Sequence, residues 1–198
     1  CLVGSEMCIR DSSDIDQASA FATLFTGSNP CFSGIAGDKT FDFEKEKEVS
    51  ILNDPEYLGN YTKENYSPKN LFSSTIGDEL KIASQGRSDV YSIAPDAESA
   101  ILSAGHAANG AFWMDNTNGK WATTTYYKGI PWYVDRYNNG PESLASRLET
   151  MVWTPTLPME KYNAFPYVLD DLPFRYTFSE KFANCYPHLK TSPFLSLI

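Results

Sequence analysis

The segment spanning 67–113 constrains the fold more than any other stretch, because it predicts a helix, a strand, a second helix and a second strand in turn. Pro68 is a favoured first helical residue, and Ser67 before it is a suitable N-cap. Gly86 predicts the end of this first helix. Four apolar residues recur at helical spacing and predict one apolar side for the helix: Leu71, Ile76, Leu80 and Ile82.

The remainder of this segment predicts a strand followed by a short helix. The β-branched and aromatic residues of 89–93 predict a short buried strand. Pro95 and Asp96 predict the start of the second helix, which is expected to end before Gly105. Helices and strands that alternate at this spacing favour an α/β fold with a mostly parallel sheet.

Outside this segment the patterns are weaker but still periodic. Helices are predicted over 16–27, 130–137 and 141–153, a charged hairpin over 41–50, and strands over 110–115 and 120–127. Residues 116–119 suit the hairpin loop between the last two strands. The stretch 154–178 is rich in Pro, Tyr and Phe without a clear period, which favours a cap or lid.

The chain divides into four expected parts. Residues 1–13 are predicted to be a non-native leader, and 14–115 part of an α/β core. Residues 116–189 are predicted to be the hairpin and an aromatic, Pro-rich cap region, and 190–198 the start of a returning core element. The opening string CLVGSEMCIRDSS resembles translated adaptor sequence found at the ends of metagenomic assemblies, although a natural irregular terminus is the alternative. We therefore expect a fragment that lacks both natural ends.

Composition excludes several classes of function. The net charge of -9 and the pI of about 4.7 disfavour a nucleic acid polymer as partner, because no basic patch is available to neutralise phosphates. No stretch approaches the roughly 20 apolar residues that span a bilayer. The two histidines, His106 and His188, and the isolated Cys31 and Cys185 indicate neither a metal site nor a disulfide framework.

Four ordered strings resemble the alkaline phosphatase superfamily: TLFTGSNP (23–30), NLFSSTIGDELKIAS (70–84), AILSAGHAANGAFW (100–113) and GKWATTTYY (119–127). Within it, the chain looks most like the bacterial phosphatase, phosphodiesterase and nucleotide-pyrophosphatase proteins common in Bacteroidetes. The resemblance implies a partial alkaline-phosphatase-like sandwich and a parent that hydrolyses small phosphate esters with two zinc ions. It also implies export to the periplasm. The family's metal ligands would all lie outside this chain.

The resemblance also places four substrate-site positions on this sequence. The position of the attacking hydroxyl falls on Gln17, whose amide cannot act as a nucleophile. The position of an Asn that binds a phosphate oxygen falls on Asp38, and the His of the same string is Ser33. The Lys-x-Arg pair that holds a phosphate monoester falls on Asp96 and Glu98. The resemblance therefore implies a substrate site with no intact catalytic residue.

These replacements oppose the binding of a dianionic monoester. Lys and Arg would attract the phosphate and donate bidentate hydrogen bonds, whereas Asp96 and Glu98 would repel it. Each like-charge contact at 4 Å costs about 4 kcal/mol at an effective dielectric constant near 20. A diester, a sulfate ester, a cationic head group or no turnover fits these residues better.

Each of these residues also has a structural interpretation. Asp96 is well placed as the N-terminal residue of its helix, and Glu98 and Asp38 as solvated surface carboxylates. His106, among small residues, is expected to be a hydrogen-bonded structural histidine, and Gln17 a polar residue at a helix start.

Two functions remain open from the sequence. The first is a fragment of a metal-dependent phosphate-ester hydrolase that is itself inactive. The second is a catalytically degenerate member of the superfamily that binds a ligand or partner. Intact zinc ligands in the parent would favour the first, and their loss would favour the second.

Overall fold

A computed structural model of the chain describes residues 16–43, 46–148, 152–153, 176–177, 186–187, 189–190 and 192. These residues fall in two compact units, which are described separately. The first unit contains 1–114 and 121–131, and the second contains 115–120 and 132–198. The expected leader, most of the expected cap, His188 and Cys185 lie outside the described residues, and the expected domain boundaries stay a prediction.

A four-stranded sheet forms the centre of the first unit. Its order is β3 (Gly59–Asn60), β6 (Trp121–Thr124), β5 (Gly110–Met114) and β4 (Tyr91–Ala94). Strands β4 and β5 are parallel, while β5–β6 and β3–β6 are antiparallel. The predicted α/β class is confirmed, but the described sheet is mixed and not mostly parallel. A connection as short as that between β5 and β6 can join only antiparallel strands.

Both predicted hairpins are present. Strands β1 (Lys39–Asp42) and β2 (Lys47–Ser50) pair antiparallel and form the charged hairpin. The β5–β6 turn is closed by Asp115, whose Oδ1 accepts hydrogen bonds from the backbone N–H of Thr117 at 2.9 Å and of Asn118 at 3.1 Å. A short Asp side chain readily makes this local turn, which is why the sequence reveals it.

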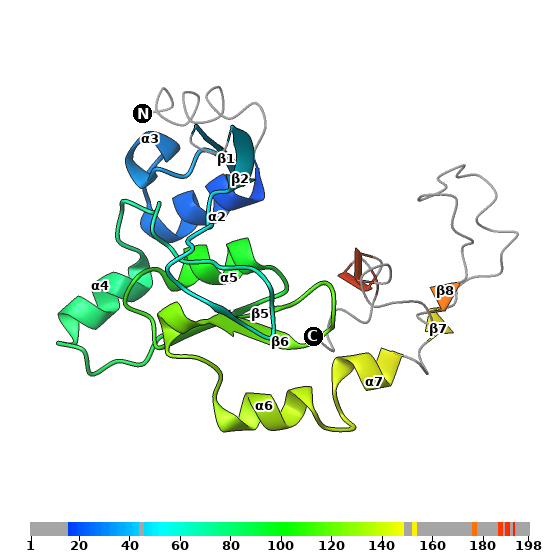
Figure 1. The fold of residues 1–198 in the computed structure, drawn as a ribbon. Helices are drawn as coiled ribbons and strands as arrows, with labels where there is room; N and C mark the ends of the chain where they lie inside the picture. The colour runs from blue at the N-terminus through cyan, green and yellow to red at the C-terminus, as the bar shows by residue number, and fades with distance from the viewer. Residues whose placement is uncertain are drawn as a thin grey trace, which may run out of the picture. The chain divides into compact units, whose positions relative to one another are not determined.

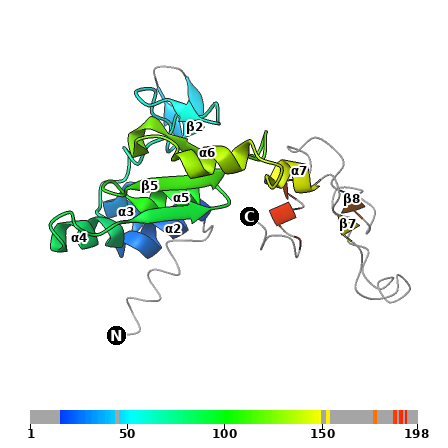
Figure 2. The same ribbon diagram turned by 90° about the horizontal axis from the view of Figure 1, so that it is seen from below.

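Helices α2 (Gln17–Thr26) and α5 (Ala97–Ala104) lie on one face of this sheet (Figure 1). Helix α5 follows β4 and packs on β4 and β5, and α2 packs on α5. In the view from below, the strands of the sheet overlap α5 and α2 (Figure 2). The short helix α3 (Pro30–Ser33) follows α2. The main core lies in these layers and includes Leu71, Ile101 and Trp113. The predicted helix over 16–27 is confirmed.

The first helix of the 67–113 segment begins later than predicted. Helix α4 spans Ile76–Ala83, and Thr75 is its N-cap in a capping box with Asp78. The side chain of Ser67 instead donates a 2.6 Å hydrogen bond to the buried carboxylate of Asp54. The Ser67 hydroxyl also accepts from the backbone N–H of Lys69. The stretch after Ser67 is therefore a turn, because the local hydrogen-bonding groups of Ser67 serve Asp54 and not a helix start.

In the second unit, α6 (Trp132–Asn138) and α7 (Leu144–Leu148) are followed by the paired strands β7 (Val152–Trp153) and β8 (Tyr176–Thr177). The predicted helix over 130–137 is confirmed. The predicted helix over 141–153 is wrong in its extent, because the end of that range is strand β7. No described helix is both long enough and apolar enough to cross a membrane.

Candidate functional site

The site predicted from the sequence lies where α2 and α5 begin. Small buried side chains allow the two helices to approach closely: Ala18 and Ala22 on α2, and Ala97, Ala100 and Ala104 on α5. Alanine keeps the helical backbones close without losing side-chain entropy. This packing places the first residue of α2, Gln17, against the first turn of α5.

Gln17 makes two hydrogen bonds across this contact. Its Nε2 donates to Oδ2 of Asp96 at 2.8 Å and to Oγ of Ser99 at 2.8 Å. A side-chain amide nitrogen carries two hydrogens, so both of its donors are used within the protein. The structure thus joins the expected nucleophile position, Gln17, to one of the two expected phosphate-clamp positions, Asp96.

Carboxylates precede both helices at this point. Asp16 is the N-cap residue of α2 and Asp96 is the N-cap residue of α5. Neither side chain bonds to the N–H groups of its own helix, and Asp96 accepts from Gln17 instead. Negative charge is favourable beside the positive end of a helix dipole. The protein's own carboxylates therefore lie where a bound anion would gain from those dipoles.

Asp38 lies on the loop before β1 and is exposed to solvent. Its backbone carbonyl accepts from the N–H of Ile51 at 2.8 Å, which fixes the loop against β2. The preceding Gly37 lies beside Asp16, since a Cβ at Gly37 would be 3.6 Å from Asp16 Oδ2. That oxygen is buried and has no hydrogen-bond partner among the described residues. Asp38 thus belongs to the loop that borders the start of α2.

Glu98 does not share the contact that Asp96 makes. It is half-buried, and positions two apart on a helix point to different sides. The pKa of the Tyr66 phenol is raised above its usual value by burial first, and then by the charges of Glu64 and Glu98. Glu98 is therefore near Tyr66. Of the two predicted clamp positions, Asp96 accepts a hydrogen bond from Gln17.

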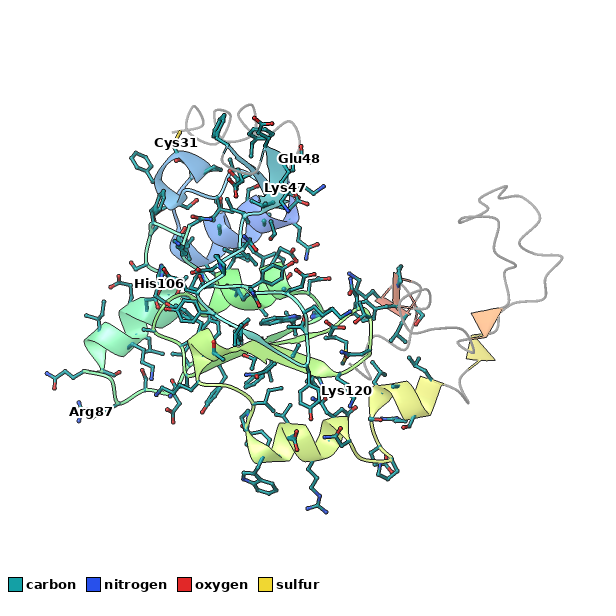
Figure 3. The ribbon with its side chains drawn as sticks, in the orientation of Figure 1. Cys31, Lys47, Glu48, Arg87, His106 and Lys120 are labelled. Carbon is teal, nitrogen blue, oxygen red and sulfur yellow. The ribbon has the colours of Figure 1, made fainter. Side chains whose placement is uncertain are left out.

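His106 has a structural role, as the sequence predicted. Its Nε2 is 2.9 Å from the carbonyl oxygen of Leu71, an arrangement in which the ring nitrogen donates. Its backbone N–H donates to Oδ1 of Asp78 at 2.9 Å. His106 lies next to α4 (Figure 3). The residue joins α4 and the turn before it to the loop after α5.

Two tyrosine hydroxyls donate hydrogen bonds to backbone carbonyls of the loop after α5. The hydroxyl of Tyr127 donates to the carbonyl of Gly105 at 2.8 Å, and that of Tyr126 donates to the carbonyl of His106 at 3.2 Å. Burial raises the pKa of both phenols. Nearby Tyr57, Asp78 and Asp54 raise the pKa of Tyr126 further, and Tyr126 and Asp78 do the same for Tyr127. Both tyrosines therefore remain neutral donors and fix the loop rather than exchange protons.

The described residues do not supply a zinc site. No group of three His, Cys, Asp or Glu side chains suited to a metal ion occurs in the described part of the chain. Gln17, Asp96 and Ser99 offer one carboxylate and two weakly coordinating neutral groups, which do not fit the donors that zinc prefers. We assign no described residue to a zinc ion.

Two residues at this site were missed from the sequence. Ser99 is three positions after Asp96, so helical periodicity places it on the same side of α5, and that signal was available. Asp16 immediately precedes the predicted nucleophile position, but nothing in the sequence indicates that one of its oxygens is buried. Only the packing of α2 reveals it.

Comparisons with known proteins agree with the resemblance found in the sequence. No protein-family model matches the chain. The chain is 37% identical over 145 residues to alkaline phosphatase PafA of Elizabethkingia meningoseptica, which is 71% of the chain and 26% of that protein. It is 32% identical over 176 residues to alkaline phosphatase PhoV of Synechococcus elongatus. That match covers 87% of this chain and 31% of PhoV. A Myroides odoratus protein named as a calcium-transporting ATPase is 35% identical over 162 residues. That match covers 80% of this chain and 29% of the Myroides protein.

Solved structures give the same result. The crystal structure of wild-type PafA matches with a TM-score of 0.66 and 36% identity, over 74% of this chain and 29% of that one. A second PafA crystal structure, of a variant with Thr-to-Ser, Asn-to-Ala, Lys-to-Ala and Arg-to-Ala substitutions, matches with a TM-score of 0.66 and 35% identity. The chain spans less than a third of the length of these relatives. Together, the sequence and structural similarities support the alkaline phosphatase superfamily as the family of this chain.

Proposed function

We propose that this chain is a segment of a phosphate-ester hydrolase of the alkaline phosphatase superfamily, and that it does not itself hydrolyse phosphate esters. The observation that carries the proposal is the hydrogen bonding of Gln17 to Asp96 and Ser99. An amide that donates both of its hydrogens to the protein has no hydroxyl to deprotonate and no free donor for a phosphate oxygen.

The spacing of substituted residues in the PafA variant supports these site assignments. Its threonine and asparagine are 21 positions apart, and its lysine and arginine are 2 apart. Gln17 and Asp38 are likewise 21 positions apart, and Asp96 and Glu98 are 2 apart. The interval between the two pairs is 62 positions in that enzyme and 58 in this chain. We infer that Gln17, Asp38, Asp96 and Glu98 occupy the four equivalent positions.

Charge at these positions argues against a phosphate monoester as the substrate of the longer protein. Three neutral or basic side chains are replaced by carboxylates, and Asp96 is already paired with Gln17. A diester carries one negative charge fewer than a monoester, so it suffers less repulsion here. We propose that the longer protein acts on a phosphodiester or a related small ester. Two zinc ions, bound by residues beyond those described, would supply Lewis acid chemistry. Export to the periplasm is part of the same proposal.

The first prediction concerns hydrolysis by the chain as it stands. The purified 198-residue chain, supplied with zinc, is expected to show no turnover of a monoester or a diester that release the same chromophore. The physical reason is the absence of a hydroxyl at Gln17. Release of the chromophore is followed by absorbance over a range of protein concentrations.

The control for this experiment is a Gln17→Ala, Asp96→Ala variant of the same chain. Activity that is equal in both proteins comes from a contaminating host phosphatase. Zinc-dependent activity that the double substitution abolishes would contradict the proposal.

A degenerate binding protein is the second candidate, and one observation favours it. The hydrogen bonds to Asp96 and Ser99 use both amide hydrogens of Gln17 without any ligand. Hydrogen bonds within the protein at this position require neither a nucleophile nor a bound phosphate. The same assay on the longer protein separates the candidates. Diester cleavage favours the hydrolase, and zinc-loaded, folded protein without any cleavage favours the binding protein.

The second prediction tests the charge argument directly. The variant Asp96→Lys, Glu98→Arg is expected to gain stabilisation by inorganic phosphate, seen as a rise in Tm that the unchanged chain does not show. The two cations would attract phosphate to the first turn of α5, where the helix dipole also favours an anion. Thermal unfolding followed by circular dichroism at increasing phosphate concentration gives the shift.

A variant with the same change in net charge elsewhere is the matched control. Glu48 and Glu56 are exposed residues outside α2 and α5, so Glu48→Lys, Glu56→Arg adds the same charge away from the site. An equal phosphate effect in both variants would show non-specific screening and would refute the assignment of the clamp positions.

A further inference from the structure

Asp16 holds a carboxylate oxygen that is left without a hydrogen-bond donor. Its Oδ2 is buried and accepts no hydrogen bond from any described residue. Asp16 is the N-cap residue of α2, yet its side chain does not bond to the N–H groups of that helix. Buried carboxylate oxygens are normally satisfied by donors, because leaving one unpaired is unfavourable. This oxygen therefore points to a donor that the described residues do not provide.

Gly37 leaves a small space beside this oxygen. Among the described residues that are not its chain neighbours, Asp16 alone comes within 4 Å of a Cβ added at Gly37, and the distance to Oδ2 is 3.6 Å. Gly37 does not have the positive φ at which glycine is required. The missing side chain thus reflects a need for space and not for an unusual backbone conformation. A small group that enters beside Gly37 would reach Asp16.

Two more carboxylates adjoin this space. Asp38 is exposed and directly follows Gly37. Asp96 accepts a 2.8 Å hydrogen bond from the side-chain amide of Gln17, the residue that directly follows Asp16. Consecutive Cα atoms are about 3.8 Å apart, so the three carboxylates gather around the start of α2. A carboxylate accepts about four hydrogen bonds, so Asp96 can serve a ligand in addition to Gln17.

The balance of charge at this point favours a cation. The three carboxylates bring as many as three negative charges to the start of α2. The N-terminus of each helix contributes only about half a positive charge, so α2 and α5 together offset about one of the three. The net charge of -9 on the whole chain adds a weaker attraction, which salt screens. A cation therefore gains more here from the carboxylates than it loses to the helix dipoles.

We infer that the space beside Gly37 binds a primary ammonium group of the substrate, so that the longer protein acts on a small phosphodiester with a primary ammonium group in one of its alcohol parts. A primary ammonium has three N–H donors and no acceptor, which matches three carboxylates. A quaternary ammonium has no donor for Asp16 and is recognised by aromatic rings instead. The described side chains form no group suited to a metal ion. The inference rests on the proposed function and extends it to the substrate.

Two independent observations lead to this assignment. Asp38 and Asp96 are two of the four positions inferred above to be equivalent to the substituted residues of PafA, on the basis of spacing along the chain. The unsatisfied oxygen of Asp16 and the space beside Gly37 come instead from the packing of the loop on α2. The carboxylates alone would define only an acidic surface. The unsatisfied oxygen adds the requirement for a hydrogen-bond donor.

The test is a titration of the 198-residue chain followed by heteronuclear NMR. Ethanolamine is the probe, choline is the quaternary comparison and ethylene glycol is the uncharged one, all at constant ionic strength. The backbone amide signals of Gly37 and Asp38 and the side-chain amide signal of Gln17 report on the site. We expect ethanolamine to shift these signals saturably, with a Kd about tenfold or more below that of choline. Ethylene glycol is expected to leave them unchanged.

Gly37→Ala tests the space without any change in charge. The added methyl group would lie 3.6 Å from Oδ2 of Asp16, an ordinary contact, so the fold should tolerate it. We expect it to raise the Kd of ethanolamine by about tenfold or more, because the ammonium can no longer approach that oxygen. Far-UV circular dichroism and Tm check that the variant is folded. An unchanged Kd in the folded variant would overturn the assignment.

The charges are tested by a double variant with a matched control. Asp38→Asn, Asp96→Asn removes two carboxylates from the site and is expected to raise the Kd of ethanolamine by about tenfold or more. Glu48→Gln, Glu56→Gln removes two exposed carboxylates elsewhere and is expected to change the Kd by less than about twofold. If the site variant does not fold, Gly37→Ala decides.

Three outcomes would overturn the inference. Equal Kd values for ethanolamine and choline, or an equal loss in the control variant, would show a general attraction of cations to an acidic chain. Saturable shifts of the same signals by inorganic phosphate would place an anion in the space. The titration measures binding without turnover, so it is separate from the hydrolase assay. Absence of hydrolysis would leave the ammonium site standing, and absence of ethanolamine binding would leave the proposed hydrolase standing.

Discussion

Replacing Asp78 by Ala is expected to destabilise the first unit by on the order of 4 kcal/mol, more than most single substitutions. The carboxylate is 5% exposed and accepts from four donors: the N–H and hydroxyl of Thr75, and the N–H groups of His106 and Ala107. Removing it leaves buried donors without partners, each at a cost of about 1–3 kcal/mol. Urea unfolding followed by tryptophan fluorescence measures the loss.

Two further variants separate the hydrogen bonds from the change in size. Asp78→Asn keeps the shape but faces an NH₂ group toward N–H donors, so we expect a loss of about 2–3 kcal/mol. Asp89→Asn is the matched control, because Asp89 is exposed and accepts a single side-chain hydrogen bond, from Asn109. A cost at Asp78 no larger than that at Asp89 would refute the role assigned to the buried carboxylate.

Replacing Gly105 by Ala is expected to cost on the order of 3 kcal/mol or more, because the backbone conformation and the space both require glycine. Gly105 has φ 74° and ψ -153°, a region that side chains other than hydrogen scarcely enter. An added Cβ would also overlap Oγ1 of Thr75 and Oδ2 of Asp78. The substitution would therefore disrupt the same hydrogen bonds that hold α4. Thermal and urea unfolding measure the effect.

Gly27→Ala provides the comparison for this prediction. Gly27 also has a positive φ, of 67°, but no atom lies within 4 Å of an added Cβ there. Replacing it by Ala should lower the free energy of unfolding only by the cost of a left-handed backbone conformation, about 1 kcal/mol. The difference between the two variants therefore combines the contact with Thr75 and Asp78 and the larger conformational cost at Gly105. Equal costs at the two glycines would show that this contact does not constrain the fold.

The position of the candidate site illustrates how far sequence reasoning extends. Gln17 and Asp96 were predicted separately, from a resemblance, and the structure joins them by a 2.8 Å hydrogen bond. Ser99 completes the contact and lies 82 positions from Gln17 in the chain. No local pattern predicts a contact over such a separation, because it depends on how α2 packs on α5.

The sequence by itself determined those features of this protein that depend on local chemistry. The alternation of helix and strand, the charged hairpin, the Asp115 turn and the end of α2 at Gly27 all follow from turn residues, glycine conformations and periodicity. Each involves hydrogen bonds between residues close in the chain. Such interactions form in the same way wherever the surrounding fold places them.

Only the tertiary structure decided where the first helix of the central segment begins and which side it buries. Ser67 is a good N-cap in isolation, but its hydroxyl is taken by the buried Asp54. The apolar residues of α4 predicted an inward side, yet Asp78 faces inward because its donors, His106 and Ala107, lie 28 and 29 positions away. Ile76, Leu80 and Ile82 are instead 70%, 52% and 68% exposed. Turning the helix to bury them would separate the buried carboxylate of Asp78 from its donors, and a buried charge without partners is strongly unfavourable.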